Sequence, residues 1–195
     1  MARVGLTGER LAYAGAELAD EVGFDQVTVS ALARRFGVQV ASLYSHVRNS
    51  DDLKLRIATV ALSELADRAA SAVAGRAGRD AVVALADVYR TYAKQHPGRY
   101  TASRHTASSA ALQAEYVAAG KRNSELMRAV LRGYDLGEPA ETDAVRLLGS
   151  LIHGYVALEL AGSFDHSSPS SDDTWPRLLG AVDSLLRTWP ERHPS

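Results

Sequence analysis

The chain contains no cysteine among its 195 residues. Disulfide bonds, thiol nucleophiles and cysteine-containing metal sites are therefore excluded, and with them the small secreted domains that depend on disulfides. Proline is also scarce, and no apolar run is long enough to span a membrane. Because the N-terminal residues lack the apolar segment of a secretion signal, we expect a cytoplasmic protein.

An excess of positive charge is also missing, since the formal net charge is −1. This is unusual for a nucleic-acid-binding protein, because neutralisation of phosphates supplies most non-specific affinity. The segment from Gln26 to Ser50, however, contains Arg34, Arg35 and Arg48 and no acidic residue. This segment is locally basic, although a pair such as Arg34 and Arg35 is also common as ordinary solvated surface charge.

Helical periodicity runs through the whole chain, and no strand pattern or repeat interrupts it. A first helix is predicted from a cap at Thr7 to Gly23, with an apolar stripe formed by Leu11, Ala14, Leu18 and Val22. Further helices are predicted over residues 50–74, 80–96, 110–132, 139–162 and 172–189, with a short helix or turn after 97–98 and a polar loop over 163–173. The expected fold class is all-α.

The most informative stretch runs from Val27 to Leu53. Thr28 can cap a short helix, and Gly37 can adopt the left-handed conformation that ends one. The chain then restarts at about Gln39, and we expect a helix of two turns that is held in place by its packing. This arrangement of two short helices joined by a tight turn predicts a helix-turn-helix DNA-binding domain.

Side chains suited to DNA contact are expected on the outer surface of this motif. They combine hydrogen-bonding groups, rings, methyl groups that can touch thymine, and one arginine for a phosphate. The predicted DNA-binding residues are Thr28, Ser30, Gln39, Val40, Ala41, Ser42, Tyr44, His46 and Arg48. The same spacing also describes a structural α-hairpin, but such a hairpin more often carries Lys and Glu where Tyr44 and His46 stand.

These residues resemble the DNA-binding domain of the tetracycline-repressor (TetR) family of bacterial transcriptional regulators. The matching residues are Thr28, Ala31, Leu32, Ala33, Phe36, Gly37, Val38, Leu43, Tyr44, His46, Val47, Asn49 and Leu53. One position departs from the family pattern, because Ser50 stands where relatives usually carry a phosphate-binding lysine. Ser50 can still cap the next helix, where Asp51 and Asp52 suit the positive helix end.

The helix predicted over 139–162 has two faces that call for burial, one with large apolar residues and one with small residues such as Gly154 and Ala157. The resemblance implies a homodimer that forms through a four-helix bundle of the last two long helices. The run Leu151–Tyr155 is also similar to the His-Gly signature of the WHG subgroup, although its tryptophan is missing. The alternative interpretation is that His153 is a core histidine with satisfied hydrogen bonds.

The resemblance further implies a small-molecule effector that binds between the helices of the second domain and moves the DNA-binding domains apart. Aromatic and polar residues predicted to line such a site are Tyr89, Tyr92, His96, Arg104, Tyr116, Met127 and His153. Because few fixed charges point inward on these helices, we expect an apolar or aromatic effector. No cofactor or metal is expected.

We therefore expect a transcriptional regulator that acts as a repressor on a pseudo-palindromic operator in double-stranded DNA. The expected domains are residues 1–48 for DNA binding and 49–195 for regulation and dimerisation. The sequence contains none of the motifs of metal-dependent hydrolases, α/β-hydrolases or nucleotide-binding enzymes, so an enzyme is not expected. The alternative is a helical interaction module of the same fold that binds little or no operator.

Overall fold

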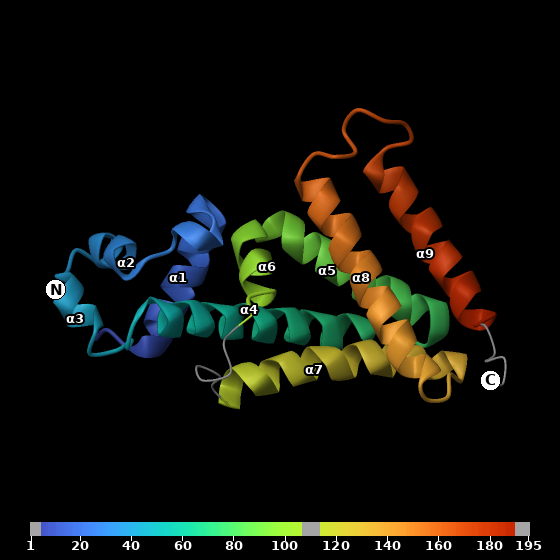
Figure 1. The fold of residues 1–195 in the computed structure, drawn as a ribbon, viewed down its shortest axis with the longest axis horizontal. Helices are drawn as coiled ribbons and strands as arrows, with labels where there is room; N and C mark the ends of the chain where they lie inside the picture. Colours follow the sequence, from blue (N-terminus) through green and yellow to red (C-terminus); the bar gives the residue numbers. More distant parts are fainter. Residues whose placement is uncertain (1–4, 107–113, 190–195) are drawn as a thin grey trace. The chain divides into compact units, whose positions relative to one another are not determined.

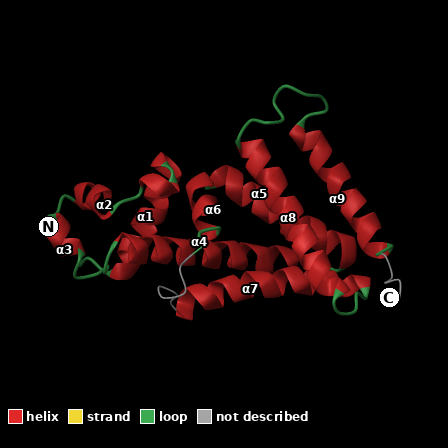
Figure 2. Cartoon of the chain, viewed as in Figure 1, coloured by secondary structure: helices red, strands yellow, loops and turns green. Residues whose placement is uncertain are grey.

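The computed structural model describes residues 5–106 and 114–189, and these residues form nine α-helices and no strand (Figures 1 and 2). The helices are α1 (Gly8–Val22), α2 (Val29–Phe36), α3 (Val40–Leu43), α4 (Ser50–Val73), α5 (Gly78–Gln95), α6 (Pro97–Ser103), α7 (Ala114–Leu131), α8 (Ala140–Leu160) and α9 (Ser171–Arg187). The predicted all-α fold class is confirmed. No helix in the described ranges combines the length and apolar character needed to cross a membrane.

The first helices begin and end where their local signals predict. The Thr7 hydroxyl accepts a hydrogen bond from the Arg10 amide at 3.1 Å, and the Thr28 hydroxyl accepts one from the Ala31 amide at 3.1 Å. Each bond satisfies one of the amides that a helix leaves unpaired at its start. Both predicted caps are confirmed.

Several predicted boundaries differ from the structure. Helix α5 begins at Gly78 rather than at 80, and α9 begins at Ser171 because Ser170 caps it by accepting a hydrogen bond from the Asp173 amide at 3.1 Å. The predicted loop over 163–173 is therefore shorter, and α9 ends at Arg187 rather than at 189. The predicted start of α7 at 110 and the C-terminal tail lie outside the described residues.

Val22 was predicted to face inward, but its side chain is 49% exposed. It is the last residue of α1, where the chain turns at Gly23 into a 3-10 turn, η1 (Phe24–Gln26). Phe24 in this turn is only 4% exposed. The aromatic ring thus occupies the core at the end of α1, and Val22 is left at the surface.

The chain forms two compact units. The first unit comprises Met1–Leu65 and Tyr92–Lys121, and the second comprises Ala66–Thr91 and Arg122–Ser195. Helices α4, α5 and α7 each contribute residues to both units. The division into functional domains at residue 48 stays a prediction.

Within the first unit, α6 packs tightly against the end of α1. A methyl group added at Gly98 would lie 1.9 Å from the carbonyl oxygen of Ala19, so only a glycine fits there. The carboxylate of Asp20 accepts a hydrogen bond from the Arg99 amide at 2.8 Å and lies 3.0 Å from His96 Nδ1. Close backbone contact and a polar cluster therefore join two segments that are far apart in sequence.

Within the second unit, Arg90 joins α5 to α8 and α9. Its Nε donates to Glu159 at 2.8 Å, and its guanidinium also pairs with Asp172 and lies 5.4 Å from the ring centroid of Trp175. The indole nitrogen of Trp175 donates in turn to Asp87 at 2.7 Å. The start of α9 is thus fixed to α5 by both charged and aromatic contacts.

Candidate nucleic-acid interface

A tight turn connects α2 to α3. Gly37 adopts φ 64° and ψ 33°, in the left-handed region that glycine occupies without steric cost, and it ends α2 as predicted. The Val38 amide then donates to the Ala33 carbonyl at 3.0 Å, which closes the end of the helix. Gln39 precedes the first residue of α3, so the restart at this residue is also confirmed.

Helix α3 is shorter than the two turns that the sequence predicts. It spans only Val40–Leu43, and the chain continues through a turn in which the His46 and Val47 amides both donate to the Leu43 carbonyl. Four residues cannot form a stable helix in isolation, so packing must hold this one. Tyr44 and His46 therefore lie in the turn after α3 rather than on the helix.

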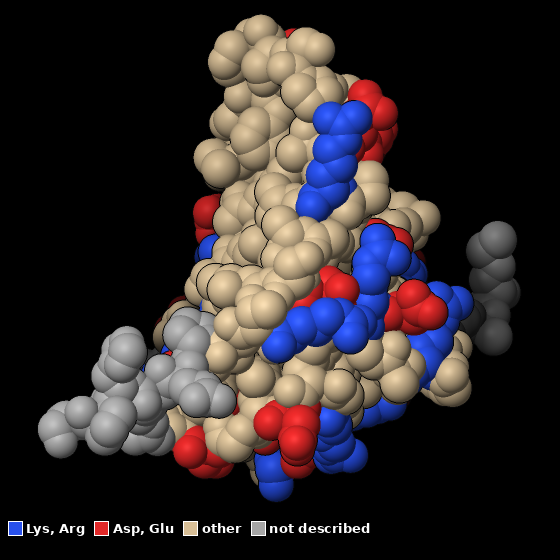
Figure 3. Space-filling model, turned by 90° about the vertical axis from the view of Figure 1, so that its right-hand side faces the viewer, with Lys and Arg blue, Asp and Glu red and all other residues tan. Residues whose placement is uncertain are grey.

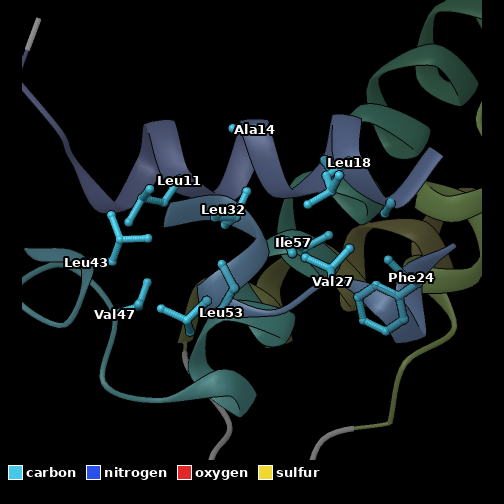
Figure 4. Packing of buried hydrophobic residues seen from close by; sticks show 14 of the residues in the cluster. Leu11, Ala14, Leu18, Phe24, Val27, Leu32, Leu43, Val47, Leu53 and Ile57 are labelled. Atoms are coloured by element: carbon cyan, nitrogen blue, oxygen red, sulfur yellow. The ribbon is translucent and has the colours of Figure 1, made fainter. Parts of the chain in front are cut away.

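The packing that holds α3 is a core shared by four helices (Figure 4). Leu11 of α1, Leu32 of α2, Leu43 of α3 and Leu53 of α4 are each fully buried, and Val47 is 2% exposed. Full burial of such a side chain contributes about 1.5–3 kcal/mol. The position of α3 is therefore set by apolar contacts with residues that come before it and after it in the sequence.

Most of the predicted DNA-binding residues lie at the surface. The Tyr44 side chain is 52% exposed. Thr28, Ser30, Gln39, Ala41, Ser42 and Arg48 are exposed as well, and Val40 and His46 are half-buried. The structure thus gathers hydrogen-bonding, aromatic and methyl groups around α3, and we call Gln39–His46 the α3 tip.

The arginines of this region are not equivalent. Arg35 Nη1 donates to Glu21 at 2.8 Å and Arg35 Nη2 donates to Glu17 at 3.2 Å, and the hydrogen bond to Glu21 is the main reason that its pKa is raised. Arg34, in contrast, is exposed and has no ion-pair partner among the described residues. Because Arg35 is paired with acidic residues and Arg34 is not, positive charge near the α3 tip rests on single residues. Figure 3 looks onto the right-hand side of Figure 1 and not onto α3, and on that face acidic and basic side chains are mixed rather than separated by sign.

The segment after the α3 tip is organised by Asp52, whose side chain is 3% exposed. Its carboxylate accepts hydrogen bonds from the Arg48 amide, the Arg48 guanidinium and Arg56 Nε. Burial acts to raise the pKa of Asp52, but these hydrogen bonds outweigh it and hold the pKa below its ordinary value. Asn49 rather than Ser50 caps α4, because the Asp52 amide donates to Asn49 Oδ1 at 2.8 Å.

A cleft of about 720 Å³ opens beside the α3 tip. Its lining includes Ser42 and His46, which the sequence indicated, and Arg10 and Phe36, which it did not. The Arg10 guanidinium lies 5.5 Å from the centroid of the Phe36 ring. No periodic signal distinguishes Arg10 from other exposed residues of α1, so only the structure brings it close to this cleft.

The residues predicted to bind an effector are divided between the two units. Tyr92, His96, Arg104 and Tyr116 belong to the first unit, and Tyr89, Met127 and His153 belong to the second. The three tyrosine hydroxyls already have partners: Tyr89 donates to Asn123, Tyr92 to Glu64 and Tyr116 to the His105 carbonyl. Arg104 is exposed, and none of the seven residues lines the 720 Å³ cleft. These residues stay a prediction.

Two family models match the chain. The model described as "Bacterial regulatory proteins, tetR family" matches residues 13–57, which contain α2, α3 and the start of α4. The model described as "Tetracyclin repressor-like, C-terminal domain" matches residues 82–182, which is more than half of the chain. Neither description names the WHG subgroup, so that assignment stays a prediction.

Two individual proteins are also similar to most of this chain. The uncharacterized HTH-type transcriptional regulator Rv0681 of Mycobacterium tuberculosis is 35% identical over 161 residues, which cover 82% of this chain and 73% of the relative. The corresponding YobS of Bacillus subtilis is 28% identical over 166 residues, which cover 84% of each chain. Both relatives are regulators of the helix-turn-helix type.

Among solved structures, a TetR variant of Acinetobacter baumannii AYE in complex with minocycline has a similar fold, with a TM-score of 0.71 and 20% identity over 96% of this chain and 100% of the other. The likeness at this identity concerns the fold alone. Together with the helix-turn-helix geometry and the two matched regions, it leads to one conclusion. The chain belongs to the TetR family of bacterial transcriptional regulators, which are DNA-binding proteins and not enzymes.

Proposed function

We propose that this protein is a repressor that binds a pseudo-palindromic operator as a homodimer and leaves it when a small molecule binds its second domain, residues 49–195. The observation that carries the proposal is the α3 tip. Exposed side chains such as Gln39 and Tyr44 are held there by the fully buried Leu43. A rigid support with exposed polar and aromatic groups is suited to contact base edges in the major groove.

The wild-type chain is first used to select a preferred duplex from a random library. The Tyr44→Ala variant then tests whether Tyr44 contributes to recognition of this operator. We expect operator affinity to fall roughly 5- to 150-fold, which corresponds to the loss of one good base contact, while affinity for random duplex changes little. Arg48→Ala should instead weaken binding to both duplexes alike, since a phosphate contact carries no sequence information. Fluorescence titrations of both duplexes at one salt concentration measure this.

Tyr13 provides a matched control for Tyr44. It lies in α1 with a similar exposure of 47%, but outside the α3 tip. Tyr13→Ala should leave binding to both duplexes unchanged. If Tyr44→Ala also binds the operator as tightly as the wild type, Tyr44 does not contact bases.

The homodimer is supported by an exposed stripe on α8. Gly154, Ala157 and Leu158 of α8 and its C-cap Ala161 follow the spacing of one helix face, and all four are exposed. Leu185 of α9 is 41% exposed as well. Small and apolar residues on one face allow a second copy of the helices to approach closely, and two-fold pairing is the commonest symmetry of homo-oligomers.

The effector is proposed to be an uncharged aromatic or apolar molecule, a class in keeping with the aromatic residues predicted for the site. A thermal-shift screen of such compounds should find compounds that raise the melting temperature and release operator DNA. Reciprocal coupling requires that operator DNA lowers the affinity for each compound by the same factor by which the compound lowers the affinity for the operator. Compounds that stabilise the protein without affecting DNA affinity would contradict the proposed coupling.

The alternative, an interaction module that reads no operator, is favoured by the ion pairs that Arg35 and Arg48 make with acidic residues. These pairs reduce the positive charge near the α3 tip. The library selection decides between the two functions: an interaction module enriches no sequence, whereas a repressor enriches a pseudo-palindrome whose symmetry follows that of the dimer.

A further inference from the structure

The segment between α3 and α4 holds one arginine in a defined position through a buried carboxylate. The Arg48 amide donates to Asp52 Oδ2 at 3.0 Å, and Arg48 Nη2 donates to Asp52 Oδ1 at 3.3 Å. The Asp52 side chain is 3% exposed, whereas the Arg48 side chain is 71% exposed. A buried acceptor therefore fixes both the backbone and the side chain of an arginine that remains accessible to solvent.

Asp52 is itself fixed from several sides. Its amide donates to Asn49 Oδ1 at 2.8 Å, and its Oδ2 accepts a second guanidinium, that of Arg56, at 3.2 Å. The residue before Arg48, Val47, is 2% exposed and belongs to the core of the first unit. The carboxylate therefore has a defined place, and it can define the place of Arg48.

We infer that Asp52 is a positioning residue for DNA binding, which orders the Arg48 guanidinium in advance for contact with a backbone phosphate of duplex DNA. This inference rests on the DNA binding proposed above and adds to it a residue that does not touch DNA. An arginine has five N–H donors, so the bond to Asp52 leaves donors for a phosphate. Ordering a long side chain before binding removes part of the entropy that binding otherwise costs.

The same contact has an opposite electrostatic effect. Asp52 brings a negative charge close to Arg48, which lowers the attraction for phosphates. Arg56 offsets part of this, because two guanidinium groups share one carboxylate and the cluster keeps one net positive charge. Removal of the Asp52 charge should lower DNA affinity if Asp52 mainly positions Arg48. It should raise DNA affinity if Asp52 mainly neutralises Arg48, so an experiment can separate the two effects.

The experiment compares Asp52→Asn with the wild-type chain on a random-sequence duplex of about 30 base pairs, long enough for two half-sites. Binding is titrated at several salt concentrations. We expect affinity to fall roughly threefold to tenfold. The slope of log K against log salt should become shallower by up to about 0.9 for each Arg48–phosphate contact that is lost, and the proposed homodimer has two such contacts. Both changes are expected although the variant has gained positive charge.

Asp51→Asn is the matched control. Asp51 is the neighbouring residue in α4, it is exposed, and its substitution changes the net charge by the same amount. This variant should bind the duplex as tightly as the wild type or more tightly, with no loss of salt dependence. A second comparison introduces Asp52→Asn into the Arg48→Ala variant, where it should cause no further loss because Asp52 acts through Arg48.

Two results would overturn the inference. If Asp52→Asn binds more tightly at every salt concentration, as Asp51→Asn does, Asp52 only lowers the positive potential. If Asp52→Asn weakens DNA binding equally when Arg48 is alanine, Asp52 acts through the stability of the fold and not through Arg48. Should Asp52→Asn fail to fold, Asp52→Glu keeps the charge but displaces the carboxylate, and positioning again predicts a shallower salt slope. A wild-type chain that binds random duplex but enriches no sequence contradicts only the proposed operator reading, and one that binds no duplex contradicts both.

Discussion

Replacing Leu185 by glutamate is expected to convert the proposed homodimer into monomers and to reduce operator affinity by about a hundredfold to ten-thousandfold. The monomer should tolerate the substitution, because Leu185 is already 41% exposed in a single chain. Only a second copy packed on α9 would bury the new carboxylate without a partner, at a large cost. Loss of the dimer removes the avidity that links two half-sites. Sedimentation velocity at micromolar concentration and operator titrations measure the two effects.

Val117→Glu serves as the control for this substitution. Val117 is 49% exposed but belongs to α7, which is not one of the two helices of the proposed interface, α8 and α9. This variant should sediment like the wild type. A wild-type chain that sediments as a monomer, or a Leu185→Glu variant that remains a dimer, would show that α9 does not form the interface.

Gly98→Ala is expected to lower the free energy of unfolding by about 2–3 kcal/mol, at the upper end of the usual range for overpacking. The added methyl group would lie 1.9 Å from the Ala19 oxygen and 2.0 Å from the Ala19 carbonyl carbon. Both atoms belong to the backbone of α1, so no side chain can move aside to make room. The melting temperature, followed by circular dichroism, should fall by roughly 5–10 °C.

Gly120→Ala should raise the free energy of unfolding, in contrast to Gly98→Ala. Gly120 lies inside α7, and an added methyl group would meet no atom within 4 Å. Because alanine favours helix more than glycine does, this variant should be more stable by about 0.5–1 kcal/mol. If the Gly98 variant melts at the wild-type temperature or above, the close approach of α6 to α1 is not present in solution.

The sequence predicted those features that depend on nearby residues. Caps at Thr7 and Thr28 and the turn at Gly37 follow from side chains and conformations within three or four residues of each helix end. The burial of Leu11 and Leu18 on one face of α1 follows from helical periodicity. These local preferences agree with the final packing, which explains why the helix-turn-helix motif could be recognised.

Features that depend on distant residues could not be predicted. Arg34 and Arg35 are equivalent in sequence, but only Arg35 meets Glu17 and Glu21, which come 18 and 14 residues earlier. Asp51 and Asp52 both suit the start of a helix, but only Asp52 is buried. Such differences arise when helices pack, and helical periodicity does not encode the partner.

The predicted effector residues show the same limit. Tyr89 and Tyr92 lie one helical turn apart on α5, yet they belong to different compact units. Their hydroxyls find separate partners, Asn123 and Glu64. An aromatic residue with helical spacing fits a packed core as well as a ligand site, so spacing alone could not decide.

The contact between Ala19 and Gly98 also bears on how such regulators can evolve or be recombined. The packed surface of the N-terminal helices includes α6. This helix begins forty residues beyond the matched N-terminal family region, which ends at residue 57. Exchanging only that region with a relative would place a foreign α1 against the native Gly98. Chimeras should therefore keep their stability only when α1 and α6 are inherited from the same parent.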